Sequence, residues 1–233
     1  MEHMAILPVK LRVKDQNYRQ PKSKLSPQWP FRIALIGRSG SGKTNLMFNL
    51  LRQTVYDDLT VIARTLDNTQ YQSLMQVVDE AEQKIGHPVA IFSEKLEDLP
   101  PVKDYSPSLQ HLVLFDDLIS LPESQLQPII PFFTQGRHQN ISCILCSQSY
   151  HKIPKTIRLQ CNYVVVFGGL NEDDTRDVWG DFVSHLTWRE FQEVYKSATQ
   201  EKYSFLVIDE NNPTMHLRKG WNQVWATDDN SDD

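Results

Sequence analysis

The chain has 233 residues, of which 40 % are hydrophobic and 23 % are charged, and its formal net charge is −5. These values are ordinary for a globular protein and fit one α/β domain with a packed core. The sequence also disfavours a membrane protein, because no apolar run approaches the roughly 20 residues of a membrane helix. The start of the chain lacks the layout of a signal peptide. We therefore expect a soluble intracellular protein without membrane insertion.

The folded domain opens with a short apolar strand over residues 31–36, which ends at a glycine-rich turn. A helix should follow, because five apolar residues recur at helical spacing: Leu46, Met47, Leu50, Leu51 and Val55. The next predicted elements are a strand, a helix and a short strand, over residues 59–63, 70–85 and 89–92.

The second half of the domain continues the alternation of strands and helices. We predict a strand over residues 111–115, a helix begun or bent at a proline over 124–135, and two strands over 141–146 and 163–167. A helical segment broken near Gly180 should follow over 173–195, then a core strand over 203–208 and an edge strand over 214–218. Strands that alternate with helices imply parallel crossover connections and a sheet covered on both faces.

The charge is spread unevenly along the chain. The first 30 residues hold six basic and two acidic side chains, a net charge of +4. Because the whole chain carries −5, the remaining residues carry a net charge of −9. The prolines in residues 1–30 predict an extended basic arm, and the aspartates in residues 223–233 predict an acidic tail. Between them we expect one domain over residues 31–222. Overall charge gives no support for DNA binding, so any DNA contact must come from a local patch.

The glycine-rich turn is the strongest chemical signal. Residues 37–44 match G-x-x-x-x-G-K-[ST] in full, between a strand and an amphipathic helix. Glycines let backbone N–H groups close around phosphates, and the helix N-terminus adds positive potential. We expect Lys43 to reach the β- and γ-phosphates of ATP and Thr44 to bind Mg²⁺. The predicted nucleotide-binding residues are Gly37, Arg38, Ser39, Gly40, Ser41, Gly42, Lys43 and Thr44.

A second signal is the pair of carboxylates Asp116 and Asp117 after four apolar residues, which is a Walker B arrangement. Phosphoryl transfer needs an acid at a strand end to hold Mg²⁺, and Asp116 fits that role. Asp117 is placed to orient or deprotonate water, although most such bases are glutamates. The alternative is two acids that open a solvent loop.

The third signal is Gln148, at the end of the strand 141–146. If this strand lies between the strand before the phosphate-binding loop and the strand before Asp116, the amide of Gln148 faces the γ-phosphate. There it can sense phosphate and position water. Cys143 and Cys146 have CxxC spacing in the same strand, but no second pair of ligands exists, so we expect buried thiols.

These signals predict an α/β fold: a single P-loop NTPase domain of the RecA/ASCE type, with a central, mostly parallel sheet flanked by helices. Two arginines, Arg137 and Arg158, are candidates for an arginine finger that a neighbouring subunit would insert into the site. A surface salt bridge is the alternative role, and for Arg158 it has equal weight. The sequence lacks the base-reading motif of GTPases, the signature of transporter ATPases and the protein-kinase motif set.

Four segments together resemble the genome-packaging ATPases of large double-stranded DNA viruses, which include poxvirus-type enzymes and belong to the FtsK–HerA superfamily. The segments are the strand and loop, the double Asp, the Gly-Arg-His and the Gln-Ser-Tyr, at residues 30–44, 114–118, 136–138 and 148–150. The loop alone is not specific to this family, but the combination in this order is. The resemblance spans residues 30–209.

The resemblance implies a pentameric or hexameric ring that hydrolyses ATP with Mg²⁺ and pulls double-stranded DNA into a preformed capsid. It also implies capsid or portal-vertex partners and a location in the virion or at the viral assembly site in the host cytoplasm. ATP would lie between subunits, with Arg137 as the first choice for the arginine in trans and Arg158 as the second. Lys152 and Lys155 are candidates for coupling phosphate state to DNA contact, with solvated loop lysines as the alternative.

Two functions from other classes remain open at this point. A small nucleoside or nucleotide kinase would fit the size and the phosphate-binding loop, but it would usually need an arginine-rich lid, and no such cluster is present. An ATP-dependent switch that only controls assembly is the other. Asp116, Asp117 and Gln148 together argue against it.

Overall fold

The computed structural model describes residues 27–213, 216–221 and 223–224. Predictions for the basic arm before residue 27, for residues 214–215 and for the tail after residue 224 lie outside the described residues. The strands are β1 Arg32–Ile36, β2 Asp58–Ala63, β3 Ala90–Ser93, β4 His111–Asp116, β5 Ile141–Ser147, β6 Tyr163–Phe167, β7 Phe205–Asp209, β8 Leu217–Lys219 and β9 Gln223–Val224. The α-helices are α1 Lys43–Gln53, α2 Thr69–Ile85, α3 Ile130–Thr134, α4 Lys155–Arg158, α5 Glu172–Phe182 and α6 Trp188–Ala198.

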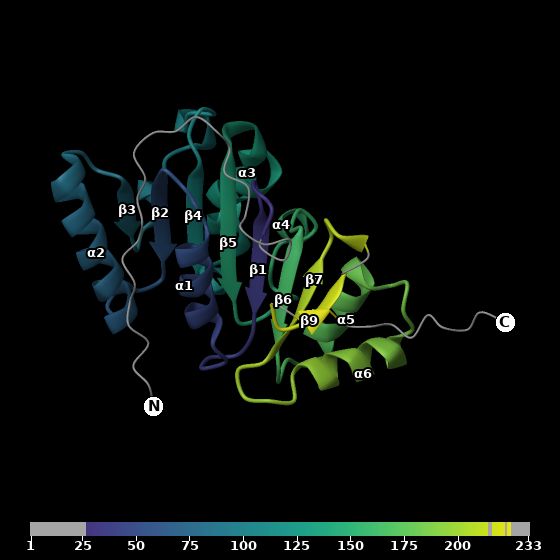
Figure 1. The fold of residues 1–233 in the computed structure, drawn as a ribbon. Coiled ribbons are helices and arrows are strands. Elements are labelled where there is room, and N and C mark those ends of the chain that lie inside the picture. Colours follow the sequence, from purple (N-terminus) through teal and green to yellow (C-terminus); the bar gives the residue numbers. More distant parts are fainter. Residues whose placement is uncertain (1–26, 214–215, 222, 225–233) are drawn as a thin grey trace.

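All described strands form one sheet in the order β3-β2-β4-β5-β1-β6-β7-β8-β9 (Figure 1). The strands from β3 to β6 run parallel, whereas β7, β8 and β9 pair antiparallel at one side. The predicted mostly parallel sheet is confirmed. β5 lies between β1 and β4, so the carboxyl ends of these three strands meet at one edge. The predicted domain boundary at residue 222 falls between β8 and β9.

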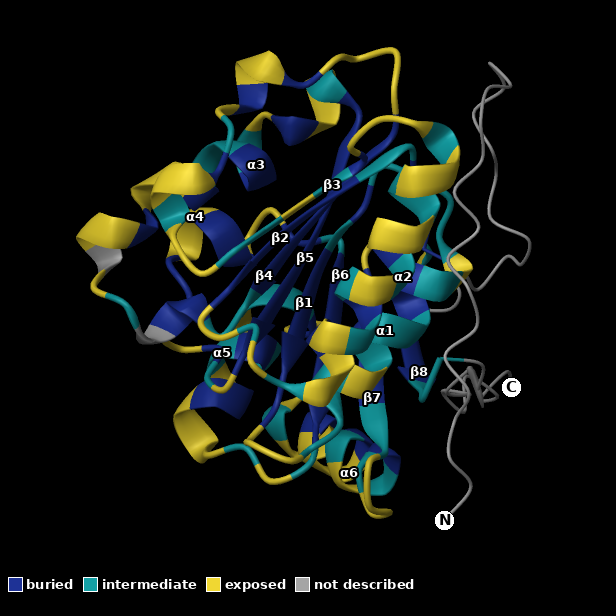
Figure 2. Cartoon of the chain, turned by 90° about the vertical axis from the view of Figure 1, so that its left-hand side faces the viewer, coloured by how far each residue is buried: buried dark blue, intermediate teal, exposed yellow. Residues whose placement is uncertain are grey.

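Helices cover both faces of the sheet, and the strands between them are buried (Figure 2). α1 and α2 pack on one face through residues that include Met47 and Leu74, and α3, α5 and α6 pack on the other through residues that include Phe132 and Phe191. Successive strand residues point to opposite faces, so Cys143 and Cys146 belong to different core layers. Both thiols are buried, and they cannot converge on one metal ion.

The structure changes several predicted helix boundaries. The segment 124–135 is a 3₁₀ helix over Glu123–Ile129 followed by the short α3, because Pro128 and Pro131 lack the N–H groups that one continuous helix needs. The break predicted near Gly180 in the segment 173–195 lies after Phe182. Thr187 and Glu190 form a capping box that starts α6 anew. No helix in the described part of the chain is long and apolar enough to cross a membrane.

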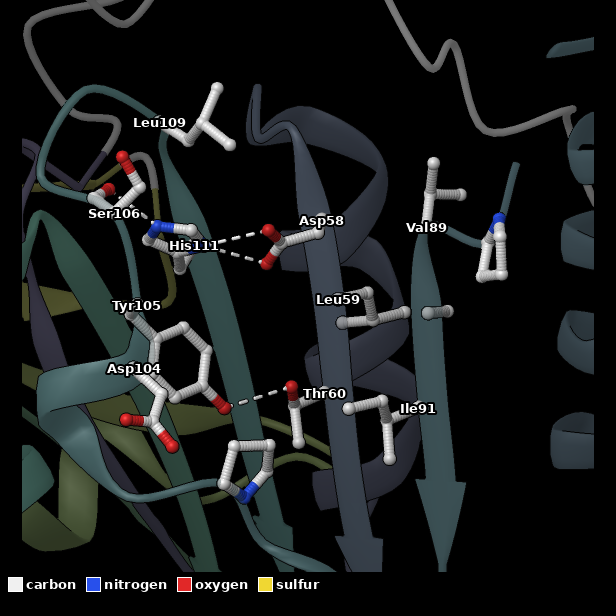
Figure 3. A pocket seen from close by; sticks show the side chains of 13 residues that line it. Asp58, Leu59, Thr60, Val89, Ile91, Asp104, Tyr105, Ser106, Leu109 and His111 are labelled. Atoms are coloured by element: carbon white, nitrogen blue, oxygen red, sulfur yellow. Dashed lines mark hydrogen bonds and ion pairs between the residues drawn. The ribbon is translucent and has the colours of Figure 1, made fainter. Parts of the chain in front are cut away.

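A partly buried ion pair joins the amino ends of β2 and β4 (Figure 3). His111 Nδ1 lies 2.7 Å from Asp58 Oδ2, and His111 Nε2 lies 2.7 Å from the carbonyl oxygen of Ser106. Burial pushes the pKa of His111 down, but the hydrogen bond and charge of Asp58, together with the Ser106 carbonyl, outweigh it and leave this pKa raised. The protonated imidazole is therefore the form that the fold stabilises.

This pair makes stability depend on pH. Because the pKa of His111 is higher in the folded state than in the unfolded state, protonation of His111 stabilises the fold. This stabilisation is complete below the unfolded-state pKa of about 6.5, and it is lost as the pH rises through the folded-state pKa. We expect the free energy of unfolding in urea to fall from pH 6 to pH 9. His111→Gln should remove that part of the slope and cost about 1–3 kcal/mol at pH 6. His87→Gln, at an exposed site, is the control; a His111→Gln variant with the parent slope would contradict the assignment.

Candidate nucleotide-binding site

The glycine-rich segment connects the carboxyl end of β1 to the first turn of α1. Gly42 adopts φ 102° as the N-cap of α1, a conformation that glycine tolerates best. A Cβ atom on Gly37 would lie 2.5 Å from Ser41 Oγ and 2.7 Å from Phe167 Cβ, so the chain can pass there only without a side chain. The pattern found in the sequence thus folds as a loop at a helix N-terminus, which is a site for phosphate groups.

Lys43 is the first residue of α1, and its side chain folds back over the loop. Its Nζ atom donates hydrogen bonds to the carbonyl oxygens of Gly37 and Arg38. Burial lowers the pKa of Lys43, although the nearby carboxylates of Asp116 and Asp117 act in the opposite direction. The ammonium group is therefore held between the loop and the carboxylates, where a terminal phosphate would lie.

The two carboxylates and the amide come from neighbouring strand ends. Asp116 ends β4, Asp117 follows it with φ 56° and ψ 28°, and Gln148 directly follows β5. Gln148 Nε2 lies 3.2 Å from Asp117 Oδ1 and 3.3 Å from Oδ2, and donates to this carboxylate. The position of β5 on which the prediction for Gln148 depended is confirmed by the strand order.

A pocket of about 180 Å³ lies over this edge of the sheet. It brings together residues from the loop and from the ends of β4 and β5, as predicted, and adds three from the β2–α2 connection. Its lining is Ser39, Gly40, Lys43, Thr44, Arg64, Thr65, Asn68, Asp116, Asp117 and Gln148. Sequence reasoning missed Arg64, Thr65 and Asn68; their position directly after β2, a parallel neighbour of β4, is the signal that could have found them.

Tyr71 of α2 is another residue that the sequence did not indicate. Its hydroxyl group donates a 2.7 Å hydrogen bond to Asp116 Oδ2, its side chain is fully buried, and its ring packs against Phe48. Burial raises the pKa of Asp116, and the charge of Asp117 adds to this, while the Tyr71 hydrogen bond acts against it; the net pKa is raised. Tyr71 therefore fixes the orientation of the carboxylate and favours its charged form.

The Tyr71–Asp116 bond gives a testable prediction. Tyr71→Phe keeps the ring but removes the hydroxyl group, so it should raise the Mg²⁺ concentration for half-maximal ATP turnover about tenfold, as the loss of such outer contacts does elsewhere. The acid limb of the pH–rate profile should move to higher pH, because Asp116 loses a contact that lowers its pKa. Tyr56→Phe is the matched control for a buried hydroxyl away from the site; equal Mg²⁺ dependence in both variants would refute the role.

The donor atoms fit Mg²⁺. This ion prefers hard oxygen ligands and is usually held by one or two carboxylates together with substrate phosphates. Thr44 supplies a hydroxyl group and Asp116 a carboxylate to the same pocket. Asp116 is oriented from behind by Tyr71, as ligating carboxylates generally are.

A further contact fixes the segment that follows Gln148. Asp174 of α5 is buried, and its Oδ1 accepts hydrogen bonds from Ser149 Oγ at 2.7 Å and from the backbone N–H of His151 at 2.8 Å. The start of α5 thereby holds the loop after β5 in place. Lys152 and Lys155 are exposed beyond this anchor.

Neither candidate arginine lines the pocket of this chain. Arg137 is exposed in the 3₁₀ turn Gly136–Gln139 at the amino end of β5, whereas the pocket lies at the carboxyl ends. Arg158 Nη1 lies 2.6 Å from Asp177 Oδ2, its Nε lies 3.0 Å from Asp181 Oδ2, and its guanidinium stacks on Tyr150. These contacts favour a structural role for Arg158 and leave Arg137 as the exposed candidate.

The chain is similar to poxvirus proteins in sequence. A family model described as "Poxvirus A32 protein" matches residues 19–212. The DNA packaging protein OPG160 of vaccinia virus (strain Copenhagen) is 28 % identical over 131 residues, which are 54 % of this chain and 48 % of that protein. For OPG160 of monkeypox virus the identity and length are the same, with 43 % of that protein covered. The match thus spans about half the length of these curated relatives.

The fold is similar to solved viral structures. The DNA-packaging ATPase B204 from Sulfolobus turreted icosahedral virus aligns with TM-score 0.58 and 15 % identity, over 82 % of this chain and 98 % of that one. B204 from Sulfolobus turreted icosahedral virus 2, in complex with AMPPCP, aligns with TM-score 0.55 and 15 % identity, over 82 % and 97 %. At this identity the likeness shows a shared fold. Because the family model matches most of its length, the chain belongs to the poxvirus A32 protein family.

Proposed function

We propose that this protein is an ATPase that drives double-stranded DNA into a viral capsid. The observation that carries the proposal is the convergence of Lys43, Asp116, Asp117 and Gln148 on one pocket at adjoining strand ends. Membership of the poxvirus A32 family gives the chemistry its biological setting, since relatives are named DNA packaging proteins.

Each residue has a role that follows from its position. The loop N–H groups and Lys43 bind the β- and γ-phosphates, and Thr44 and Asp116 would hold Mg²⁺, which neutralises charge on the phosphates when bound. Asp117 accepts a proton from, or orients, the attacking water. Gln148 donates to Asp117 in the present structure, so its amide links the water-activating carboxylate to the loop that begins after β5.

We further propose that subunits assemble into a pentameric or hexameric ring with ATP between them. Arg64 lines the pocket, but neither Arg137 nor Arg158 does, and Arg137 is exposed in the turn before β5, at the far end of that strand. An arginine supplied by the next subunit would complete the site and couple hydrolysis to assembly. Capsid or portal-vertex proteins are the partners that such a ring would dock on.

Steady-state ATP hydrolysis at low salt, measured over a range of protein concentrations with and without long duplex DNA, tests this function. A packaging motor should turn over faster with DNA, and its specific activity should rise with protein concentration as rings form. Turnover that ignores both variables would contradict the motor. A phosphorylated nucleoside product would identify a kinase instead, and tight ATP binding without turnover would identify an assembly switch.

A further inference from the structure

A tyrosine has a backbone conformation that usually belongs to glycine, in the turn between α6 and β7. The carbonyl oxygen of Glu201 accepts hydrogen bonds from the backbone N–H of Ser204 at 3.1 Å and from Ser204 Oγ at 2.6 Å, which closes the turn. Tyr203 is the third residue of this turn and has φ 69°. Turns with positive φ at that position favour glycine or asparagine, and for a bulky residue the angle is an outlier. Such strain is concentrated at ligand-binding and active sites.

The strand order brings this turn beside the phosphate-binding loop. β7 runs antiparallel to β6, and Phe205 pairs with Phe167 at the carboxyl end of β6. β6 is in turn the parallel neighbour of β1 (Figure 1). The amino end of β7 therefore lies at the same edge of the sheet as the loop that follows β1. A Cβ atom on Gly42 would lie 3.4 Å from Tyr203 Cδ1, so the tyrosine ring borders the loop itself.

The ring of Tyr203 is open to solvent on this edge. Tyr203 is 55 % exposed, whereas Phe167, which also borders Gly42, is buried. The Nζ atom of Lys202 lies over the Tyr203 ring, 4.8 Å from its centroid. The ammonium group thus covers one face of the ring, and a flat ligand would stack on the other face.

The chemistry of the pocket sets the direction in which a bound nucleotide lies. Asp117 and Gln148, the groups placed to handle the attacking water, follow β4 and β5. The γ-phosphate has to face them, because the attacking and leaving oxygens lie roughly in line across that phosphate. β6 and β7 lie on the other side of β1 from β4 and β5. The nucleoside therefore leaves the loop toward β6 and β7, on the side of Tyr203.

Arg38 lies on the same side of the loop. It is exposed, and its Cδ atom would lie 3.8 Å from a Cβ atom on Gly169, the second residue after β6. The side chain thus extends from the loop toward the β6–α5 connection, and Arg38 is not among the residues that line the pocket around Asp116 and Asp117. Aromatic rings and guanidinium groups are the side chains on which bases stack, and both types border this side of the loop.

We propose that the ring of Tyr203 is the surface on which the adenine base of ATP stacks, with the guanidinium group of Arg38 beside it. This inference rests on the proposed nucleotide site and adds to it the position of the nucleoside. The strained turn before β7 then has a function, because it holds the aromatic ring next to the loop and exposes it to the base.

Binding of ATP and of inorganic tripolyphosphate to the full chain tests the assignment. Tyr203→Ala should raise the Kd for ATP about tenfold, as loss of an aromatic stacking partner does for other bases. It should leave the Kd for tripolyphosphate, which has no base, unchanged. Tyr203→Phe keeps the ring and should bind both ligands as the parent does. Leu159→Ala is the control for an exposed apolar side chain, since Leu159 is 45 % exposed and precedes β6 at the opposite edge of the sheet.

The two ligands separate this proposal from the nucleotide site on which it rests. Lys43→Ala should weaken binding of both ligands, whereas Tyr203→Ala should weaken only that of ATP. Unchanged ATP affinity in Tyr203→Ala would overturn the proposal, and so would an equal loss for the two ligands, because Tyr203 would then support the loop and not the base. A parent protein that binds neither ligand would refute the nucleotide site itself and, with it, the stacking role.

Tyr203→Gly separates the ring from the backbone strain. Glycine adopts φ 69° without a steric penalty, so this variant should have a melting temperature at or above that of the parent. Its Kd for ATP should still rise about tenfold, because the stacking surface is lost. Parent-like ATP binding by Tyr203→Gly would overturn the proposal.

Photolabelling locates the base directly. In 2-azido-ATP the reactive group is on the adenine ring, so irradiation of the complex should attach the label to the peptide that contains Tyr203, as identified by mass spectrometry. An excess of ATP should prevent the labelling. Attachment to residues 64–68, on the other side of the loop, would contradict the direction assigned to the nucleotide and overturn the proposal.

Discussion

Lys43→Ala is expected to abolish ATP turnover while the protein stays folded. The side chain is the cation that lies between the loop carbonyls and the carboxylates Asp116 and Asp117, so its loss removes the ammonium group that would offset the charge developing on the γ-phosphate. Removing one such electrostatic contact from a buried site typically costs about 10²- to 10³-fold in rate. Phosphate release under saturating ATP and Mg²⁺ measures the effect.

Lys84→Ala is the matched control, since Lys84 lies in the exposed last turn of α2. It should keep the parent rate and the parent melting temperature. Near-normal hydrolysis by Lys43→Ala would refute the assignment of residues 37–44 as the catalytic phosphate-binding loop, because no other lysine lines the pocket.

Arg137→Ala is expected to cut turnover by about 10³-fold or more, with ATP binding and stability retained, if Arg137 acts on the site of a neighbouring subunit. Arg137 is exposed at the amino end of β5, whereas the pocket lies at the carboxyl ends of the strands, so Arg137 does not act on the pocket of the same chain. Mixing then provides a direct test. A Lys43→Ala subunit still offers Arg137 to its neighbour, so mixed rings of Lys43→Ala and Arg137→Ala should regain part of the activity that each lacks alone.

Arg158→Ala separates the two arginines. It leaves Asp177 and Asp181 without their shared guanidinium, and the loss of one partner from a largely buried ion pair costs about 3 kcal/mol. We expect a lower melting temperature for this variant and not a selective loss of turnover. A stable Arg158→Ala protein that binds ATP without hydrolysing it would transfer the finger role to Arg158, and failure of the mixed rings would argue against a shared site.

Much of the fold and of the site could be predicted from local sequence, because the decisive signals lie within short segments. The loop pattern, the apolar run before Asp116 and the strand before Gln148 each fix a strand end, and parallel crossovers place those ends at one edge. The position of β5 between β1 and β4 made Gln148 a pocket residue. The roles of these residues in catalysis stay predictions.

The residues that the sequence did not reveal depend on packing between distant segments. Tyr71 has the spacing of an ordinary core residue with Leu74 and Val78, and only the docking of α2 brings its hydroxyl group to Asp116. Arg158 has the sequence context of a surface arginine until α5 supplies two aspartates. Hydrophobic periodicity predicts which face of a helix is buried, but it does not predict which polar atoms of distant segments contact that face.

The left-handed backbone of Asp117 limits which amino acids fit at this position without strain. Glycine, asparagine and aspartate tolerate φ near 56° best, and other residues pay about 1–2 kcal/mol. Of these three, only aspartate carries a carboxylate. The backbone of the turn after β4 therefore favours the shorter acid at a position where glutamate is the usual base. Among relatives, we expect glutamate at this position only where that turn has a different shape.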